Sequence, residues 1–118
     1  MKLSLVTMAL AATAAVACGS SQPPTARYAT TSASVRAAHE VGAEKVPDAQ
    51  LHLAMAEDQL AQAKRLMNDG ENEKATWMLS RAQSDADLAV ALAREADTRS
   101  AADQVSAQIR QVQERRTP

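Results

Sequence analysis

The fold is decided by residues 47–96, which read PDAQLHLAMAEDQLAQAKRLMNDGENEKATWMLSRAQSDADLAVALAREA. Apolar residues recur there at alternating spacings of three and four, on both sides of a break at residues 68–70. The two seams are Val46, Ala49, Leu53, Ala56, Leu60, Ala63 and Met67, and then Ala75, Leu79, Ala82, Ala86, Ala89, Ala93 and Ala96. This spacing lines side chains along one helix face. It predicts helices over about 47–68 and 72–114 that pack as an antiparallel αα-hairpin.

Local signals place the ends of these two helices. Pro47 suits a first helical position, where a missing N–H costs nothing, and Asp48 complements the positive end of the helix dipole. Gly70 is expected in the left-handed conformation that ends a helix. Asn72 is expected to cap the next helix. The third helix is much longer than the second, so its last half has no partner of matching length in the hairpin.

A short additional helix is expected over 29–43, with Gly42 as its stop. Its apolar stripe is Ala33, Ala37 and Val41. A second stripe on the third helix carries Trp77, Leu88 and Leu92. We expect the first helix to pack on that stripe, with Trp77 as a packing residue. A ligand-stacking role for Trp77 is the alternative.

Composition favours an all-α protein and excludes several classes. Alanine fills 27 of the 118 positions, and there is no Phe, one Trp and one Tyr. Large β-branched and aromatic residues are therefore too scarce for a β-sandwich or barrel. A net charge of −1 argues against nucleic-acid binding, which needs clustered Lys and Arg. One cysteine excludes an internal disulfide.

The N-terminus reads MKLSLVTMALAATAAVAC, with Lys2 before an uncharged run that is too short to span a bilayer. Its end, Ala15-Val16-Ala17-Cys18, resembles the lipobox of bacterial lipoproteins, although Ala15 stands where that family prefers Leu. The resemblance implies that residues 1–17 are a signal peptide and that Cys18 carries the lipid. An ordinary signal peptide with a free Cys18 thiol is the alternative.

The lipoprotein resemblance also implies a location and an organisation. Several acyl chains give durable membrane attachment. In Gram-negative hosts an Asp after the lipidated Cys favours inner-membrane retention, so Gly19 implies transport to the outer membrane, facing the periplasm. Residues 18–28 are expected to form the lipidated Cys and a flexible Pro-containing linker that lifts the fold off the headgroups, and residues 29–116 the helical domain.

The end of the third helix has its own apolar stripe, formed by Ala102, Val105, Ile109 and Val112. The stripe indicates contact with another chain, either a second copy or an envelope protein. The alternative is a solvent-exposed helix end. Weak electrostatic contact with anionic wall polymers such as peptidoglycan is conceivable through Arg110, Arg115 and Arg116.

The sequence offers no catalytic constellation, cofactor motif or metal-ligand motif, so we expect a protein that is not an enzyme. Glycine occurs only at 19, 42 and 70, which excludes a Gly-rich phosphate loop. Asp85 and Asp87 point to different sides of a helix and form no dyad. His39 with Glu40 and Glu44 could supply metal ligands, but solvated helix-surface residues are the simpler interpretation.

Residues 36–96 resemble an uncharacterised domain of small bacterial envelope lipoproteins. The matching positions are Gly42, Ala43, Pro47, Leu53, Ala56, Leu60, Ala63, Gly70, Ala75, Ala82, Asp87, Leu88 and Ala89. That family has no assigned activity, so the resemblance implies location and fold. The expected function is a structural or adaptor module of the envelope. The alternative is a tetratricopeptide-like module that holds a peptide or glycan between its helices near Trp77 and Arg81.

Overall fold

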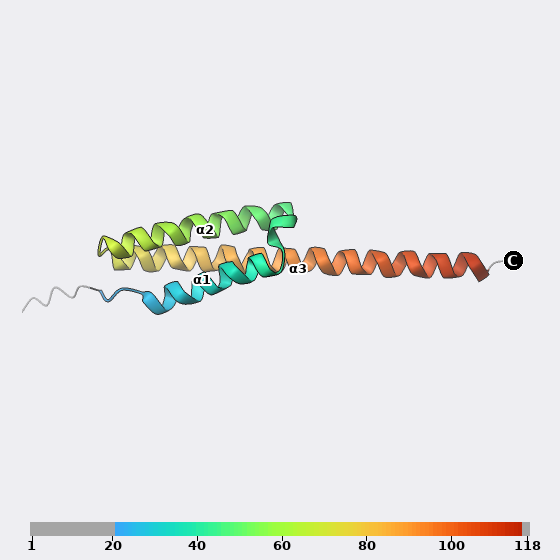
Figure 1. Ribbon diagram of the computed structural model, residues 1–118, viewed down its shortest axis with the longest axis horizontal. Helices are drawn as coiled ribbons and strands as arrows, with labels where there is room; N and C mark the ends of the chain where they lie inside the picture. Colours follow the sequence, from blue (N-terminus) through green and yellow to red (C-terminus); the bar gives the residue numbers. More distant parts are fainter. Residues whose placement is uncertain (1–20, 117–118) are drawn as a thin grey trace, which may run out of the picture.

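The protein is a slender three-helix structure in which one helix is far longer than the others (Figure 1). The computed structural model describes residues 21–116. The elements are α1 (Thr25–Glu40), the single 3₁₀ turn η1 (Ala43–Lys45), α2 (Pro47–Asn68) and α3 (Asn72–Arg116). Within residues 21–116 there is no strand. The predicted all-α class and the hairpin with a long C-terminal helix are confirmed.

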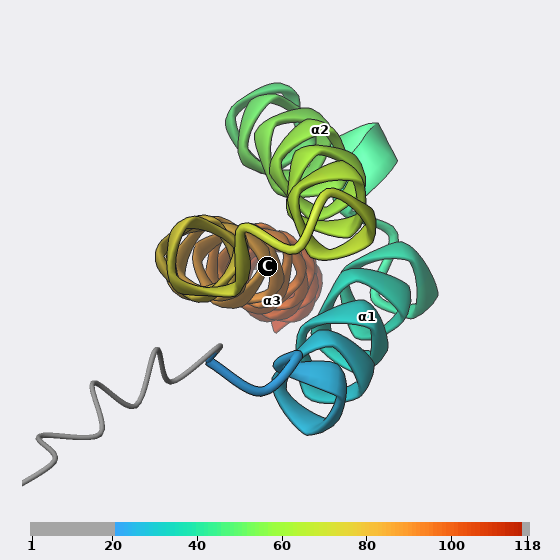
Figure 2. The same cartoon turned by 90° about the vertical axis from the view of Figure 1, so that its left-hand side faces the viewer.

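The hairpin of α2 and α3 is built on the two predicted alanine-rich seams. Viewed along the long axis, α2 and α1 both lie against α3 (Figure 2). Every seam residue of α3 from Ala75 to Ala93 is buried, and α2 buries Ala49, Leu53, Ala56 and Ala63 against it. Methyl side chains allow the two helices to approach closely. Leu79 is the largest fully buried side chain, so the core is thin.

The turn between α2 and α3 also forms as expected, except at its last residue. Gly70 has a φ of 77°, in the left-handed region. Asn72 does not cap α3: it is the first helical residue, and its side-chain amide donates a hydrogen bond to the backbone oxygen of Ser21. Asn72 therefore holds the N-terminal segment against the turn, a role that local capping rules could not reveal.

Helix α1 begins and ends earlier than expected. The expected linker reached residue 28, but α1 starts at Thr25, because the Pro24 carbonyl accepts the Tyr28 N–H at 2.9 Å. A proline just before a helix loses no helical hydrogen bond, because an N–H at that position would have no acceptor within the helix. The helix ends at Glu40, where Gly42 with a φ of 74° leads into η1. The linker within the described residues is accordingly only Ser21 to Pro24.

The expected packing of α1 is wrong. The helix buries Thr31, Val35 and Ala38 instead of its predicted stripe. It lies on the flank of α3 that carries Ser80 and Gln83. Arg27 donates to the Ser80 hydroxyl at 3.2 Å, and Gln83 donates to the Ser34 hydroxyl at 2.6 Å.

Trp77 is therefore left exposed, and it is not a packing residue. It follows Ala75 by two residues, about 200° around the helix, so it points away from the seam. Leu88 shares this outer face and is also exposed. Leu92 is partly buried and packs against the core. The periodicity correctly placed Trp77 and Leu88 on one face, but α1 lies on a different flank of α3. That flank carries Ser80 and Gln83, which are about 60° and 120° around the helix from Trp77.

Candidate functional site

The C-terminal part of α3 extends beyond both partner helices (Figure 1). Its 20 residues from Asp97 to Arg116, which we call the tail, are all exposed and correspond to about 30 Å of helix. The predicted contact residues lie here: the side chains of Val105, Ile109 and Val112 are 54%, 53% and 51% exposed, and Ala102 is also exposed. Large apolar side chains in a row on an otherwise polar helix are typical of a surface that binds another chain.

A groove lies at the opposite end of the molecule, between the last turns of α2 and the first turns of α3. It has a volume of about 670 Å³ and we call it the Trp77 groove. From α2 it is lined by Gln62, Arg65, Leu66 and Asp69, and from α3 by Lys74, Trp77, Met78 and Arg81. Three cationic side chains thus face one carboxylate, in a chain whose overall charge is −1.

The indole of Trp77 is 70% exposed and borders two hollows. The second hollow, of about 430 Å³, continues along α3 past Ser80, Ser84 and Asp85, and it shares Trp77 and Arg81 with the first. Trp77 and Arg81 were named from the sequence as residues near a possible groove, whereas Arg65 was missed. Whether Arg65 lines the groove depends on which flank of α2 faces α3 near the turn, and the seam pattern alone does not specify that flank.

The cations of the groove differ in their partners. Lys74 forms an ion pair with Glu71, and the Glu71 carboxylate raises the pKa of Lys74 by accepting its hydrogen bond. The side chains of Arg65 and Arg81 make no hydrogen bond or ion pair with any residue between 21 and 116. Two guanidinium groups next to an exposed indole are therefore available to an anion.

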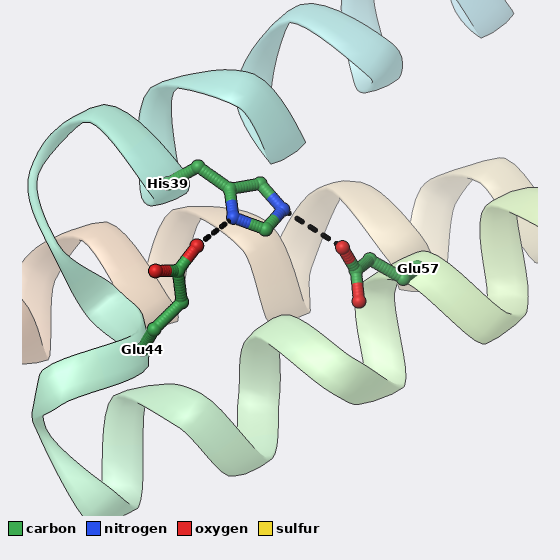
Figure 3. A network of polar contacts seen from close by, with 3 residues as sticks. All are labelled: His39, Glu44 and Glu57. Carbon is green, nitrogen blue, oxygen red and sulfur yellow. Dashed lines mark hydrogen bonds and ion pairs between the residues drawn. The ribbon is translucent and has the colours of Figure 1, made fainter.

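A second polar cluster ties three elements together around His39 (Figure 3). Its Nδ1 contacts the Glu44 carboxylate of η1, and its Nε2 lies 2.7 Å from Oε1 of Glu57 on α2. The hydrogen bonds to Glu44 first, and then to Glu57, raise the pKa of His39. Glu44 was expected near His39, but Glu57 replaces Glu40 as the other carboxylate. The cluster stabilises the α1–α2 connection.

A third polar cluster bridges α2 and α3. One carboxylate oxygen of Asp85 lies 2.9 Å from Nδ1 of His52. The other accepts a hydrogen bond from the Gln59 amide at 2.8 Å. Gln59 is buried, and Asp85 and His52 are partly buried. Asp85 thus pairs with two side chains of α2 at partly buried positions, so the cluster fixes the register of the hairpin.

Between residues 21 and 116, no group of three His, Cys, Asp or Glu side chains is placed to hold a metal ion. Over the same part of the chain, no helix has the length and hydropathy required to cross a bilayer. Cys18, the predicted lipidation site, lies outside the described residues, and so do the signal peptide and Thr117-Pro118.

A family model described as a domain of unknown function (DUF4398) matches residues 26–105. The chain belongs to this family. The DUF4398 match covers α1, η1, α2 and α3 as far as Val105, so it includes both polar clusters and the Trp77 groove. It ends within the tail, before Ile109 and Val112. No curated protein and no solved structure matches the chain.

Proposed function

We propose that this DUF4398 protein is a non-enzymatic lipoprotein of the bacterial outer membrane, anchored through lipid on Cys18 and facing the periplasm. In this proposal the helical rod is a scaffold or adaptor, and its tail binds a second chain. The observation that carries the proposal is the row of half-exposed Val105, Ile109 and Val112 on a helix end without a partner in residues 21–116. The lipobox-like sequence before Cys18 supports the anchor.

The course of the chain gives the proposed anchor a direction. Ser21 contacts Asn72 at the α2–α3 turn. Only two residues lie between Cys18 and Ser21, and the three Cα–Cα steps that join them span at most about 11 Å. A lipid on Cys18 would therefore hold the turn end of the rod close to the bilayer. The tail is at the other end of α3, whose 45 residues measure about 67 Å.

A second copy of this chain is the partner that the tail fits best. The first half of the tail carries a net charge of −1, from Asp97, Arg99 and Asp103, and the second half carries +2, from Arg110, Glu114, Arg115 and Arg116. Two tails in antiparallel orientation place acidic starts beside basic ends and also oppose the helix dipoles. A parallel pair would place arginines beside arginines. The antiparallel pair has its two anchored turn ends at opposite ends, so both lipids reach one membrane when the pair lies along the membrane surface.

Antiparallel pairing also predicts a register for the apolar stripe. When the two tails are centred on residue 107, Ala102 lies opposite Val112 and Val105 lies opposite Ile109. A small side chain then faces a large one, and two large ones meet near the centre, as close packing requires. The pair has few apolar layers, so we expect a dimer that dissociates on dilution.

Sedimentation of the mature chain with Cys18→Ser tests the tail. The expected result is a concentration-dependent dimer that Val105→Asp with Ile109→Asp abolishes. Leu51→Asp is the matched control, because Leu51 is 59% exposed on α2 and lies outside the tail. A monomer at all concentrations, or a dimer that survives the double substitution, would remove the tail from the proposal.

Mass spectrometry of the mature N-terminus, combined with cell fractionation, tests the anchor. The expected result is a chain that begins at Cys18, carries acyl groups and fractionates with the outer membrane. A Cys18→Ala variant should lose the acyl mass and leave the membrane fraction. An unmodified Cys18 thiol in the soluble periplasm would refute the anchored location.

A further inference from the structure

We propose that the Trp77 groove binds an acidic saccharide, with a sugar ring against the indole of Trp77 and the carboxylate of the sugar on Arg65 and Arg81. The site is at the α2–α3 turn, and its contacts are independent of both the lipid anchor and the tail. The proposed scaffold function and this binding site can therefore fail separately.

The first argument is the exposed indole. Tryptophan is the largest apolar side chain, and here 70% of its surface is open to water on a helix where a polar residue would cost nothing. Exposed aromatic faces flanked by polar groups are typical of binding sites. A sugar ring has a face of C–H groups that can cover such an indole, and its hydroxyl groups remain at the edges for hydrogen bonding.

The second argument is the charge beside that face. Arg65 and Arg81 lie on the two helices that border the groove, and neither has an acidic partner within residues 21–116. Guanidinium groups bind carboxylates through two parallel hydrogen bonds. Lys74 adds a third positive charge but is already paired with Glu71, so it contributes attraction at longer range.

The third argument is the shape and polarity of the rim. The two hollows share Trp77 and Arg81 in their linings, so the indole and the Arg81 guanidinium border both of them. Gln62 and Asp69 border the first hollow, and Ser80 and Ser84 border the second. Amides, carboxylates and hydroxyls at the edge of an aromatic platform are suited to the hydroxyl and amide groups of an amino sugar.

The charges of the nearby turn favour a sugar over a bilayer surface. Asp69, Glu71 and Glu73 lie at the same end of the molecule, and all three are exposed. A flat anionic membrane would meet these carboxylates together with the arginines, and the repulsion would offset much of the attraction. A small ligand within the groove meets the arginines and Asp69 but not Glu71 or Glu73, which do not line it.

Fluorescence provides a direct test, because Trp77 is the only tryptophan of the chain. The mature chain is titrated with N-acetylmuramic acid and, as the matched neutral sugar, with N-acetylglucosamine, which lacks the carboxylate. We expect a saturable change in Trp77 emission with the acidic sugar. The neutral sugar should bind about tenfold more weakly or worse, as expected for the loss of one charge-assisted hydrogen-bonded contact.

Two variants examine the assigned residues. Arg65→Gln with Arg81→Gln should weaken binding of the acidic sugar by about tenfold or more, whereas Arg94→Gln, on an exposed part of α3 about 20 Å along the helix, should leave it unchanged. Trp77→Leu should abolish binding measured by calorimetry. All four positions are exposed, so circular dichroism should show unchanged helix content in every variant.

Several outcomes would overturn the proposal. Equal affinity for both sugars would remove the role of the arginines, and no saturable response to either sugar would remove the saccharide. A response to a tetraglutamate peptide alone would reassign the groove to acidic peptides. A response to anionic phosphatidylglycerol vesicles alone would reassign it to lipid headgroups.

Discussion

The thinness of the core makes one substitution unusually informative. Leu79 is fully buried near the turn end of the α3 seam, where its neighbours on the same face are Ala75, Ala82 and Ala86. Replacing Leu79 with Ala removes three carbons from a site whose neighbours along the α3 seam are alanines. Such short side chains cannot extend into the vacated space, so a cavity remains and the loss exceeds the transfer free energy alone.

The expected cost follows from the burial of Leu79. Fully buried Leu→Ala substitutions lower the free energy of unfolding by roughly 3–5 kcal/mol when the site does not collapse. For a domain of this size each kcal/mol shifts the melting temperature by roughly 4–8 °C. We therefore expect Leu79→Ala to lower the melting temperature by at least about 12 °C, with about 3 kcal/mol lost at the midpoint.

The measurement is thermal unfolding of the mature chain followed by circular dichroism at a helical wavelength. Leu51→Ala makes the same chemical change at a position that is 59% exposed on α2, and we expect a change within about 0.5 kcal/mol. Similar losses at the two positions would refute the reasoning. They would mean that the α2–α3 seam is not the source of stability.

Three further predictions concern single polar and backbone positions, each measured as a shift in the unfolding midpoint. The folded-state pKa of His39 is raised above its ordinary 6.5, so its contribution to stability is complete below that value and is lost as pH rises through the folded pKa. As pH rises through the folded pKa of His39, the unfolding midpoint should fall in the wild type and stay constant in His39→Gln. Equal pH profiles for the two proteins would contradict the ion-pair assignment. Asp85→Ala leaves the buried Gln59 amide without its acceptor and should cost about 1–3 kcal/mol, whereas no loss would show that water replaces the carboxylate. The Cβ added by Gly70→Ala would meet no atom within 4 Å, but Ala would have to adopt a φ of 77°. We expect the free energy of unfolding to fall by about 1 kcal/mol, and by less in Gly70→Asn, because Asn tolerates the left-handed region better.

The sequence predicted the hairpin well because both of its seams are periodic and local. The spacing from Ala75 to Ala93 alone specifies which face of α3 is buried, and Pro47 and Gly70 fix two of the ends. Neither inference requires knowledge of a distant contact. The tail was also visible in the sequence, since a helix of 45 residues cannot be covered by one of 22.

The arrangement of α1 could not be predicted in the same way. Its apolar residues are mostly alanines, which are nearly as compatible with one face as with another. The choice is made by contacts between distant polar residues, such as Gln83 with Ser34 and Arg27 with Ser80. The link between His39 and Glu57 joins residues 18 positions apart on different helices, and it likewise has no periodic signal.

The same geometry explains where a partner of the tail would lie. Successive residues of a helix are 100° apart around its axis. Counted from Ala93, the large side chains of the tail stripe lie about 100–160° around α3, away from the seam that α2 covers; they are Val105, Ile109 and Val112. Ser80 and Gln83, which contact α1, fall within or near the same sector. The flank that receives α1 is therefore polar beside α1 and apolar beyond its end. In the proposed dimer, the partner helix on the tail continues the line of α1 along α3. The change from Ser and Gln to Val and Ile on this flank fits that arrangement: α1 covers the polar part through hydrogen bonds, and a second chain would remove the apolar part from water.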